Sequence, residues 1–214
     1  MEMKIKIDRK NADKPLNRPW TFGVNTCHAK LWLREDLACQ AKKAADGCGF
    51  KYIRFHNILS GDLGVYAEDE TGNPGVNFEK FDVIFDKVIS CGCLPFFEIS
   101  FCPPKLSSGD RRICFYKADI TIPNSYDKWT YLIEKIIEHV IDRYGVNCVE
   151  KWFFEVWNEP DIFFDGTMED YFELYDYTAT AIKRVNKNLR VGGPATSKCL
   201  WIKEFIEHIE TGSA

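Results

Sequence analysis

The sequence predicts an α/β fold in which parallel strands alternate with helices, as in a barrel of βα units. Short runs rich in aromatic and β-branched residues alternate with longer segments whose apolar residues recur every three or four positions. The 214 residues are 45% hydrophobic and 14% aromatic, which is enough for a sizeable core. The segment from Phe22 to Thr26 does not match GxGxxG, and this disfavours a doubly wound sheet.

Five segments are predicted to be strands. Each is short, apolar or aromatic, and bounded by polar or turn-forming residues. In chain order they are Trp20–Asn25, Tyr52–His56, Leu94–Ser100, Trp152–Asn158 and Arg190–Pro194. Because a helix is predicted after each strand, the strands are expected to run parallel. A complete (β/α)8 (TIM) barrel needs about 250 residues, so we expect about the first five βα units of an incomplete barrel.

Five helices are predicted between and after these strands. In chain order they are Glu35–Asp46, Phe78–Cys91, Ser125–Tyr144, Asp170–Val185 and Leu200–Glu210. The third is the clearest, because its apolar residues form one stripe from Trp129 to Tyr144. Asn124 or Ser125 can cap its start, and Gly145 suits its end. The fourth begins with Thr167-Met168-Glu169-Asp170, a pattern typical of a capping box.

The chain divides into a short leading segment and one domain. Residues 1–18 are expected to form a leading strand, Lys4 to Asp8, and a linker, and residues 19–214 the partial barrel. Two connections are long, Asn57–Val76 and Phe101–Asn124. Both follow the carboxyl end of a strand, where barrel enzymes build their active sites. Long loops in compact domains are more often functional than not, so we expect the site at this end.

Charge and motifs exclude several classes of protein. The 28 Lys and Arg residues against 32 Asp and Glu give a net charge of −4, without the basic stripe that nucleic-acid binding requires. No apolar run approaches the roughly 20 residues of a membrane span, and no secretory signal is evident, so a cytoplasmic protein is expected. Nine scattered cysteines without paired CxxC spacing are expected to be reduced and buried, with no metal site.

The segment from Lys151 to Asp161 is the sharpest candidate for chemistry, because a predicted strand ends in Asn-Glu-Pro. A general acid needs a carboxyl group whose pKa is raised by partial burial or a nearby negative charge. Phe153 and Trp157 share the strand parity of Glu159 and could lower the polarity on its side. Asn158 can donate to a hydroxyl beside the reacting carbon. The alternative is a solvated glutamate at the start of a loop.

A second candidate lies on the strand Tyr52–His56. Arg54 and His56 share parity, so both side chains face the same side of the sheet. A buried arginine needs carboxylate partners, and Glu98 and Glu155 are the candidates. The group is either a structural ion network or a positive charge that orients a catalytic carboxylate, with His56 contacting the substrate. His28, in a predicted loop, is expected to be an ordinary histidine.

Two aromatic residues, Phe115 and Tyr116, lie inside the second long connection. Aromatic rings on such a loop suit stacking against sugar rings. A small hydrophobic cluster beneath the loop explains them about equally well.

Six segments resemble glycoside hydrolase family 39, within the clan of retaining (β/α)8 glycosidases that carry Asn-Glu at the end of the fourth strand. They cover nearly the whole chain in order: GFKYIRFH (49–56), SGDLGVY (60–66), FDVI (81–84), PFFEISF (95–101), WFFEVWNEP (152–160) and VGGPA (191–195). The resemblance implies hydrolysis of β-xylosides and xylo-oligosaccharides without a cofactor.

The resemblance also implies roles for individual residues. Glu159 is implied as the general acid/base and Asn158 as the ligand of the 2-hydroxyl group. His56 and Phe115 are implied to line the sugar subsite at the cleaved bond. Arg54 is implied to hold the nucleophile in place, with Glu98 in a supporting position.

A retaining glycosidase needs a second carboxylate, the nucleophile, about 5–5.5 Å from the acid/base. In the family it is a glutamate at the end of the seventh strand. The glutamates that follow Glu159 all fall in predicted helices: Glu169, Glu173, Glu204, Glu207 and Glu210. We therefore expect the 214-residue chain to be inactive alone. Two alternatives remain. The first is a truncated or split-gene half-barrel that binds carbohydrate or a partner chain without catalysis; the partner would be a second copy of the chain or a missing C-terminal half. The second is an iduronidase-like or cellulase-like enzyme.

Overall fold

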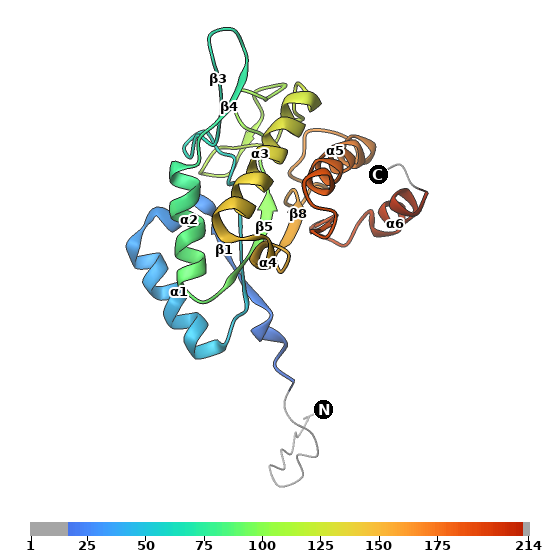
Figure 1. Ribbon diagram of the computed structural model, residues 1–214. Coiled ribbons are helices and arrows are strands. Elements are labelled where there is room, and N and C mark those ends of the chain that lie inside the picture. Colours follow the sequence, from blue (N-terminus) through green and yellow to red (C-terminus); the bar gives the residue numbers. More distant parts are fainter. Residues whose placement is uncertain (1–16, 212–214) are drawn as a thin grey trace, which may run out of the picture.

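The computed structural model describes residues 17–211, so the strand expected at Lys4 to Asp8 lies outside the described residues. A five-stranded parallel sheet forms the centre (Figure 1). Its strands, in spatial and chain order, are β1 (Gly23–His28), β2 (Tyr52–His56), β5 (Leu94–Ile99), β8 (Phe153–Val156) and β9 (Arg190–Gly192). All four neighbouring pairs are parallel, as expected.

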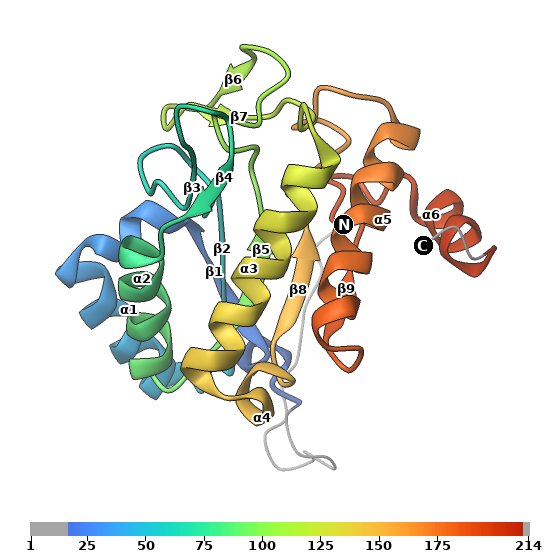
Figure 2. The ribbon, with the colours of Figure 1, turned by 45° about the horizontal axis from the view of Figure 1, so that its top comes forward.

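The connections between these strands identify a barrel-type sheet. Each strand lies beside the one that precedes it in this sheet, so the order never reverses. The large helices lie together on one side of the strands (Figure 2): α1 (Glu35–Cys48), α2 (Glu79–Ser90), α3 (Tyr126–Tyr144) and α5 (Met168–Val185). The short α4 (Val146–Val149) precedes β8, and α6 (Ile202–Glu210) follows β9. A doubly wound sheet reverses its strand order and carries helices on both faces, so the predicted partial barrel is confirmed.

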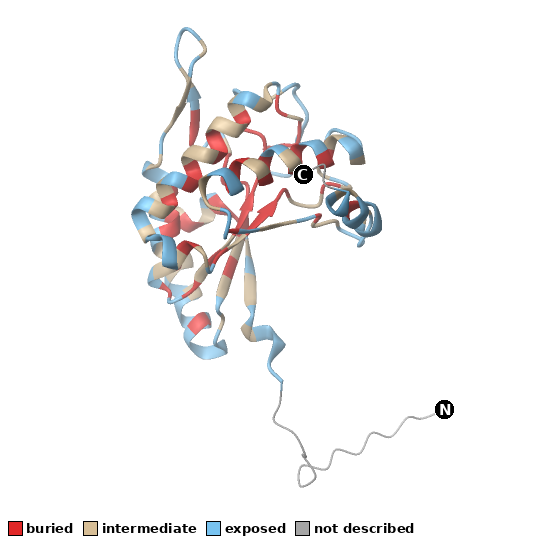
Figure 3. Cartoon of the chain, turned by 45° about the vertical axis from the view of Figure 1, so that its right-hand side comes forward, coloured by how far each residue is buried: buried red, intermediate tan, exposed pale blue. Residues whose placement is uncertain are grey.

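The core lies between the sheet and its helices, where buried residues are concentrated (Figure 3). Phe85 of α2 is at its centre and fully buried. Its ring packs against Phe55 of β2, Phe97 of β5 and Trp152, with centroid distances of 5.3, 5.0 and 5.6 Å. Alternate residues of the strands thus point outward to the helices.

The opposite face of the sheet carries a layer of aromatic side chains near the amino ends of the strands. Phe22, Tyr52 and Phe153 have ring centroids 5.1–5.8 Å apart, and Phe96 stacks on Phe153 at 5.2 Å. Phe22 is 50% exposed. No described helix covers this inner face (Figure 2).

The sequence prediction for the first strand was wrong. The first strand was expected at Trp20, but Pro19–Thr21 form a 3-10 turn and the strand runs from Gly23 to His28. Proline suits the first position of a helical turn, because its fixed φ is already helical. Each of the two long connections contains an antiparallel hairpin: β3 (Tyr66–Glu68) with β4 (Pro74–Val76), and β6 (Arg112–Ile113) with β7 (Ala118–Asp119).

The predicted helix caps are confirmed. The Ser125 hydroxyl accepts from the N–H of Lys128 at the start of α3, and Gly145 follows its last residue. Thr167 and Asp170 form a reciprocal capping box at the start of α5, at 3.2 and 2.7 Å. Local hydrogen bonds of this kind depend on near neighbours in the chain, so the sequence predicts them well.

All nine cysteines are free thiols. Only Cys91, Cys93 and Cys102 are buried, so the expectation of buried cysteines was wrong for the other six. Within residues 17–211, no set of three His, Cys, Asp or Glu side chains could hold a metal ion. None of the helices in this range has the length and apolar character needed to cross a membrane.

Candidate active site

Arg54 is the centre of a charged cluster on the inner face of the sheet, at the carboxyl ends of the strands. Its Nε and Nη2 donate to the two carboxylate oxygens of Glu155 at 2.7 and 2.9 Å. Nη2 also donates to Oδ1 of Asn158 at 3.0 Å and lies 3.7 Å from Glu98. Burial alone would lower the pKa of Arg54, but the hydrogen bonds with Glu155 and the charges of Glu98 and Glu159 raise it above its ordinary value. The two predicted carboxylate partners therefore do surround this arginine.

Glu98 differs from Glu155 although the two residues are register partners on adjacent strands. Its side chain is fully buried, and neither carboxyl oxygen meets a hydrogen-bond partner within the described residues. Burial raises the pKa of Glu98 to about 8, the Arg54 charge opposes this, and the Glu155 charge adds to it. Since Arg54 is already engaged by Glu155, burial dominates at Glu98 and favours the protonated form of this carboxyl group.

Asn158 and Glu159 follow β8 in a turn, and both are half-buried. The N–H of Glu159 donates to the carbonyl oxygen of Ala195, beyond the end of β9, at 3.0 Å. The carbonyl oxygen of Glu159 accepts from the N–H groups of Ile162 and Phe163 at 3.0 and 2.7 Å. These backbone bonds fix the position of Glu159, and its side-chain charge acts on Arg54.

The expected strand parity of Trp157 and Glu159 was wrong. The strand ends at Val156, and Trp157 and Glu159 have φ values of 69° and 48°, in the left-handed region. The alternation of side chains between the two faces of the sheet therefore ends before Trp157. Its indole is fully buried and donates to the carbonyl oxygen of Phe163 at 2.6 Å. Trp157 supports the turn that carries Glu159.

Tyr171 of α5 lies against the end of β8 and the residue that follows β9. Its hydroxyl donates to the carbonyl oxygen of Val156 at 3.0 Å. A side chain at Gly193 would collide with this hydroxyl, so only glycine allows the chain after β9 to pass here. A cavity of about 460 Å³ opens beside Arg54, Glu155 and Ala195 on the inner face.

His56 lies at the end of β2 and faces the other side of the site. Its Nε2 is 3.0 Å from the hydroxyl of Tyr116. Burial, followed by the charges of Arg54 and His28, lowers the pKa of His56 to about 4, so the ring is neutral at neutral pH. His28 is the register partner of His56, and its ring stacks on Tyr116 at 4.6 Å.

His28 and Tyr116 were not assigned to the site from the sequence. His28 was placed in a loop, because β1 was expected to end at Asn25, whereas this strand continues to His28. Phe115, the aromatic residue that was assigned, is 83% exposed and contacts the site only through His28 and Tyr116, at 5.7 and 5.0 Å.

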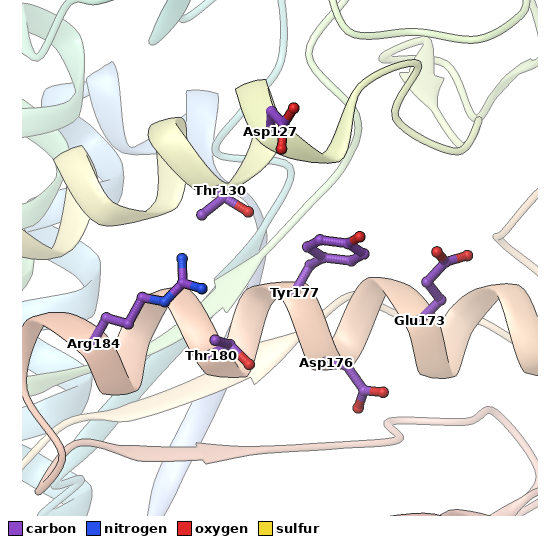
Figure 4. Close-up of a pocket in the computed structure, with 7 residues that line it drawn as sticks. All are labelled: Asp127, Thr130, Glu173, Asp176, Tyr177, Thr180 and Arg184. Atoms are coloured by element: carbon purple, nitrogen blue, oxygen red, sulfur yellow. The ribbon is translucent and has the colours of Figure 1, made fainter. Parts of the chain in front are cut away.

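A second cavity of about 420 Å³ lies on the outer helical layer between α3 and α5 (Figure 4). Two of its charged groups are already engaged, since Asp176 accepts from His208 at 2.9 Å and Arg184 lies 3.6 Å from Glu134. Tyr177 stacks on Tyr126 at 4.3 Å. Because the cavity is remote from the strand ends, the Arg54 cluster is the stronger candidate site.

A parallel sheet whose carboxylates, amide and guanidinium gather at the carboxyl ends of its strands has the layout of a (β/α) barrel enzyme. The chain belongs to the glycosyl hydrolases family 39, whose model matches residues 3–214.

Similar proteins and solved structures are consistent with this family. The chain is 47% identical over 206 residues to a beta-xylosidase of Caldicellulosiruptor saccharolyticus and 37% identical over 212 residues to a beta-xylosidase of Geobacillus stearothermophilus. Each match covers 95% of this chain and 42% of the relative, so the chain spans less than half of their length. The crystal structure of a monomeric beta-xylosidase from Caulobacter crescentus CB15 matches with a TM-score of 0.88 and 38% identity, over 94% of this chain and 41% of that one.

Proposed function

We propose that the whole protein to which this chain belongs is a retaining glycoside hydrolase of β-xylosides and xylo-oligosaccharides, with Glu159 as its general acid/base. The observation that carries this proposal is the position of Glu159: a half-buried carboxyl group beside Asn158 and the Arg54 cluster, fixed by its backbone bond to Ala195. Such a group can protonate a glycosidic oxygen and later activate a water molecule.

Asn158 suits the proposed contact with the sugar hydroxyl beside the reacting carbon. Its amide oxygen accepts from Arg54 at 3.0 Å. This bond directs the amide NH2 group away from Arg54 and leaves its two protons to donate to a ligand. In this proposal Arg54 orients Asn158, in addition to any role toward the nucleophile.

The two histidines provide the polar wall of the proposed sugar subsite. Nε2 of His28 and Nδ1 of His56 are buried without a hydrogen-bond partner among the described residues. Buried polar atoms are normally paired, and a neutral imidazole can donate to or accept from a sugar hydroxyl. Phe115, on the rim, is retained in this proposal as a stacking residue.

We infer that the nucleophile is not one of the described carboxylates of the cluster. Glu98 is fully buried and Glu155 is held by two hydrogen bonds to Arg54, so neither is free to attack an anomeric carbon. Without a nucleophile a retaining mechanism cannot proceed. The 214-residue chain alone is therefore proposed to be inactive.

Substitution of Glu159 by Gln in the whole protein tests the acid/base role. With an aryl β-xyloside that has a poor leaving group, kcat/KM should fall by about 10²–10⁴, the contribution of general acid catalysis. A highly activated aryl leaving group needs no proton, so the first step should be partly restored for this substrate. The measurement is initial-rate kinetics with both substrates.

Glu169→Gln is the matched control, since Glu169 is exposed in the first turn of α5 and should keep parental rates. No restoration by the activated leaving group would contradict the assignment of Glu159. Measurable turnover by the purified 214-residue chain would contradict the inference about the nucleophile.

The exposed inner face favours a second candidate, a half-barrel that binds a partner chain or a second copy of itself without catalysis. The half-exposed Phe22 belongs to its aromatic layer, and large apolar patches on a surface usually mark interfaces. A monodisperse monomer of the chain in light scattering would count against this candidate.

A further inference from the structure

One nitrogen of Arg54, Nη2, is close to three acceptor groups but carries two protons. It donates to a carboxylate oxygen of Glu155 at 2.9 Å and to Oδ1 of Asn158 at 3.0 Å. Oε2 of Glu98 lies 3.7 Å from the same nitrogen, beyond hydrogen-bond distance. Glu98 is therefore the acceptor that receives no proton from Nη2.

Glu98 has no substitute for this missing hydrogen bond. Its side chain is fully buried, and both of its carboxyl oxygens are without a partner among residues 17–211. Because a buried carboxylate without hydrogen bonds is costly, the protonated form of Glu98 is favoured. Loss of the proton would create a negative charge that attracts Nη2 of Arg54, 3.7 Å away.

The ionisable side chains around Glu98 come from the strands on both sides of β5, from the β6–β7 turn and from α5. They are Arg54 and His56 of β2, Glu155 of β8, Tyr116 and Tyr171. Burial raises the pKa of the two tyrosines and lowers that of His56, so all three are neutral at neutral pH. The Arg54 charge favours ionisation of Glu98, and the Glu155 charge opposes it. Arg54 is thus the positive charge on which an ionised Glu98 would draw.

Movement of Nη2 toward Glu98 would break its bond to Asn158. That bond keeps the amide oxygen of Asn158 on Arg54 and leaves the NH2 group to a ligand. Without it the amide can rotate, and its contact with the sugar hydroxyl is weakened. The bond from Nε of Arg54 to Glu155, at 2.7 Å, does not involve Nη2 and would persist. The cluster would therefore stay assembled while the Asn158 contact is lost.

We propose that Glu98 is a positioning residue of the reaction: when protonated it leaves Nη2 of Arg54 to Asn158, and when ionised it withdraws this nitrogen and releases the Asn158 amide. This inference rests on the proposed function. It makes hydrolysis sensitive to pH through a side chain that lies beneath the site and does not touch the sugar.

The test measures kcat/KM of the whole protein for an aryl β-xyloside with a highly activated leaving group. The pH is raised through about 8, the value to which burial raises the pKa of Glu98. This substrate needs no proton from Glu159, so ionisation of the acid/base does not lower its rate. The parent should lose about 10-fold in kcat/KM, the effect of one hydrogen bond. Glu98→Gln cannot ionise and should show no such fall.

Two further variants complete the test. Asp86→Asn is the matched control, because it also removes a carboxylate that pairs with an arginine, here Arg143 on the outer helical layer. It should keep the parental fall. Asn158→Ala removes the amide through which Glu98 acts. Its kcat/KM should be lower than that of the parent at neutral pH and should no longer fall as the pH rises.

The outcomes separate this inference from the proposed function. A parental kcat/KM that does not fall with pH, an equal fall in Glu98→Gln, or a fall that persists in Asn158→Ala would each overturn the inference. Should Glu98→Gln not fold, the comparison of the parent with Asn158→Ala decides. No hydrolysis of the activated xyloside by the parent would instead overturn the proposed function, and the role of Glu98 with it.

Discussion

Replacing Glu98 by Gln tests whether this buried carboxyl group holds a proton in the folded protein. Its ordinary pKa is 4.5, and burial raises it to about 8. The unfolded chain releases the proton near pH 4.5, while the folded chain keeps it until about pH 8. In between, the unfolded state binds fewer protons, so the stability of the parent protein falls as pH rises.

The size of this effect follows from the two pKa values. Each pH unit inside the window lowers the free energy of unfolding by at most 1.36 kcal/mol. Between pH 4.5 and pH 7 the Glu98 contribution therefore falls by about 3 kcal/mol. Gln cannot titrate, so the variant Glu98→Gln lacks this pH-dependent loss. Between pH 4.5 and pH 7 the free energy of unfolding of the variant, relative to that of the parent, should therefore rise by the same amount.

Urea unfolding followed by tryptophan fluorescence at several pH values between 4.5 and 7 measures this difference. Any constant cost of fitting an amide into the site cancels, because only the change with pH is used. Glu70→Gln, in the exposed β3–β4 turn, is the control and should show no shift. A stability difference that stays constant across the pH range would refute a protonated Glu98.

Two further substitutions test the packing and the capping of the fold by urea unfolding. Phe85→Ala should lower the free energy of unfolding by about 3–5 kcal/mol, because this fully buried ring contacts β2 and β5; a cost under 1 kcal/mol would contradict its central position. Thr167→Ala should lower the free energy of unfolding by about 1 kcal/mol, because the capping bond from the N–H of Asp170 is lost. Thr167→Ser keeps the hydroxyl and should retain most of the parental stability. Equal losses in the two variants would exclude the hydroxyl as the cause.

The sequence predicts the elements that depend on near neighbours in the chain. The bounds of β2 and both predicted caps are confirmed, because strand composition and capping bonds are local properties. The contacts of Arg54 with Glu98 and Glu155 were also predicted, since a buried arginine requires carboxylate partners.

The parts of the site that the sequence did not reveal depend on contacts between distant segments. His28 joins His56 only through the register of β1 on β2. Tyr116, rather than Phe115, meets His56 because of the way the β6–β7 turn lies over the strand ends. The turn at Glu159 is stabilised by Ala195 and by the buried Trp157, and neither contact is encoded in the Asn-Glu-Pro motif.

The backbone bond between Glu159 and Ala195 means that the proposed acid is positioned by two strands and one helix. Gly193 leaves room for Tyr171, whose hydroxyl ties down the end of β8 two residues before Asn158. A side chain at Gly193 would therefore displace the proposed proton donor although Gly193 is no part of the proposed sugar subsite. In a mutational scan, residues of β9 and α5 should appear among the functionally intolerant positions, and an engineer who redesigns specificity should leave them unchanged.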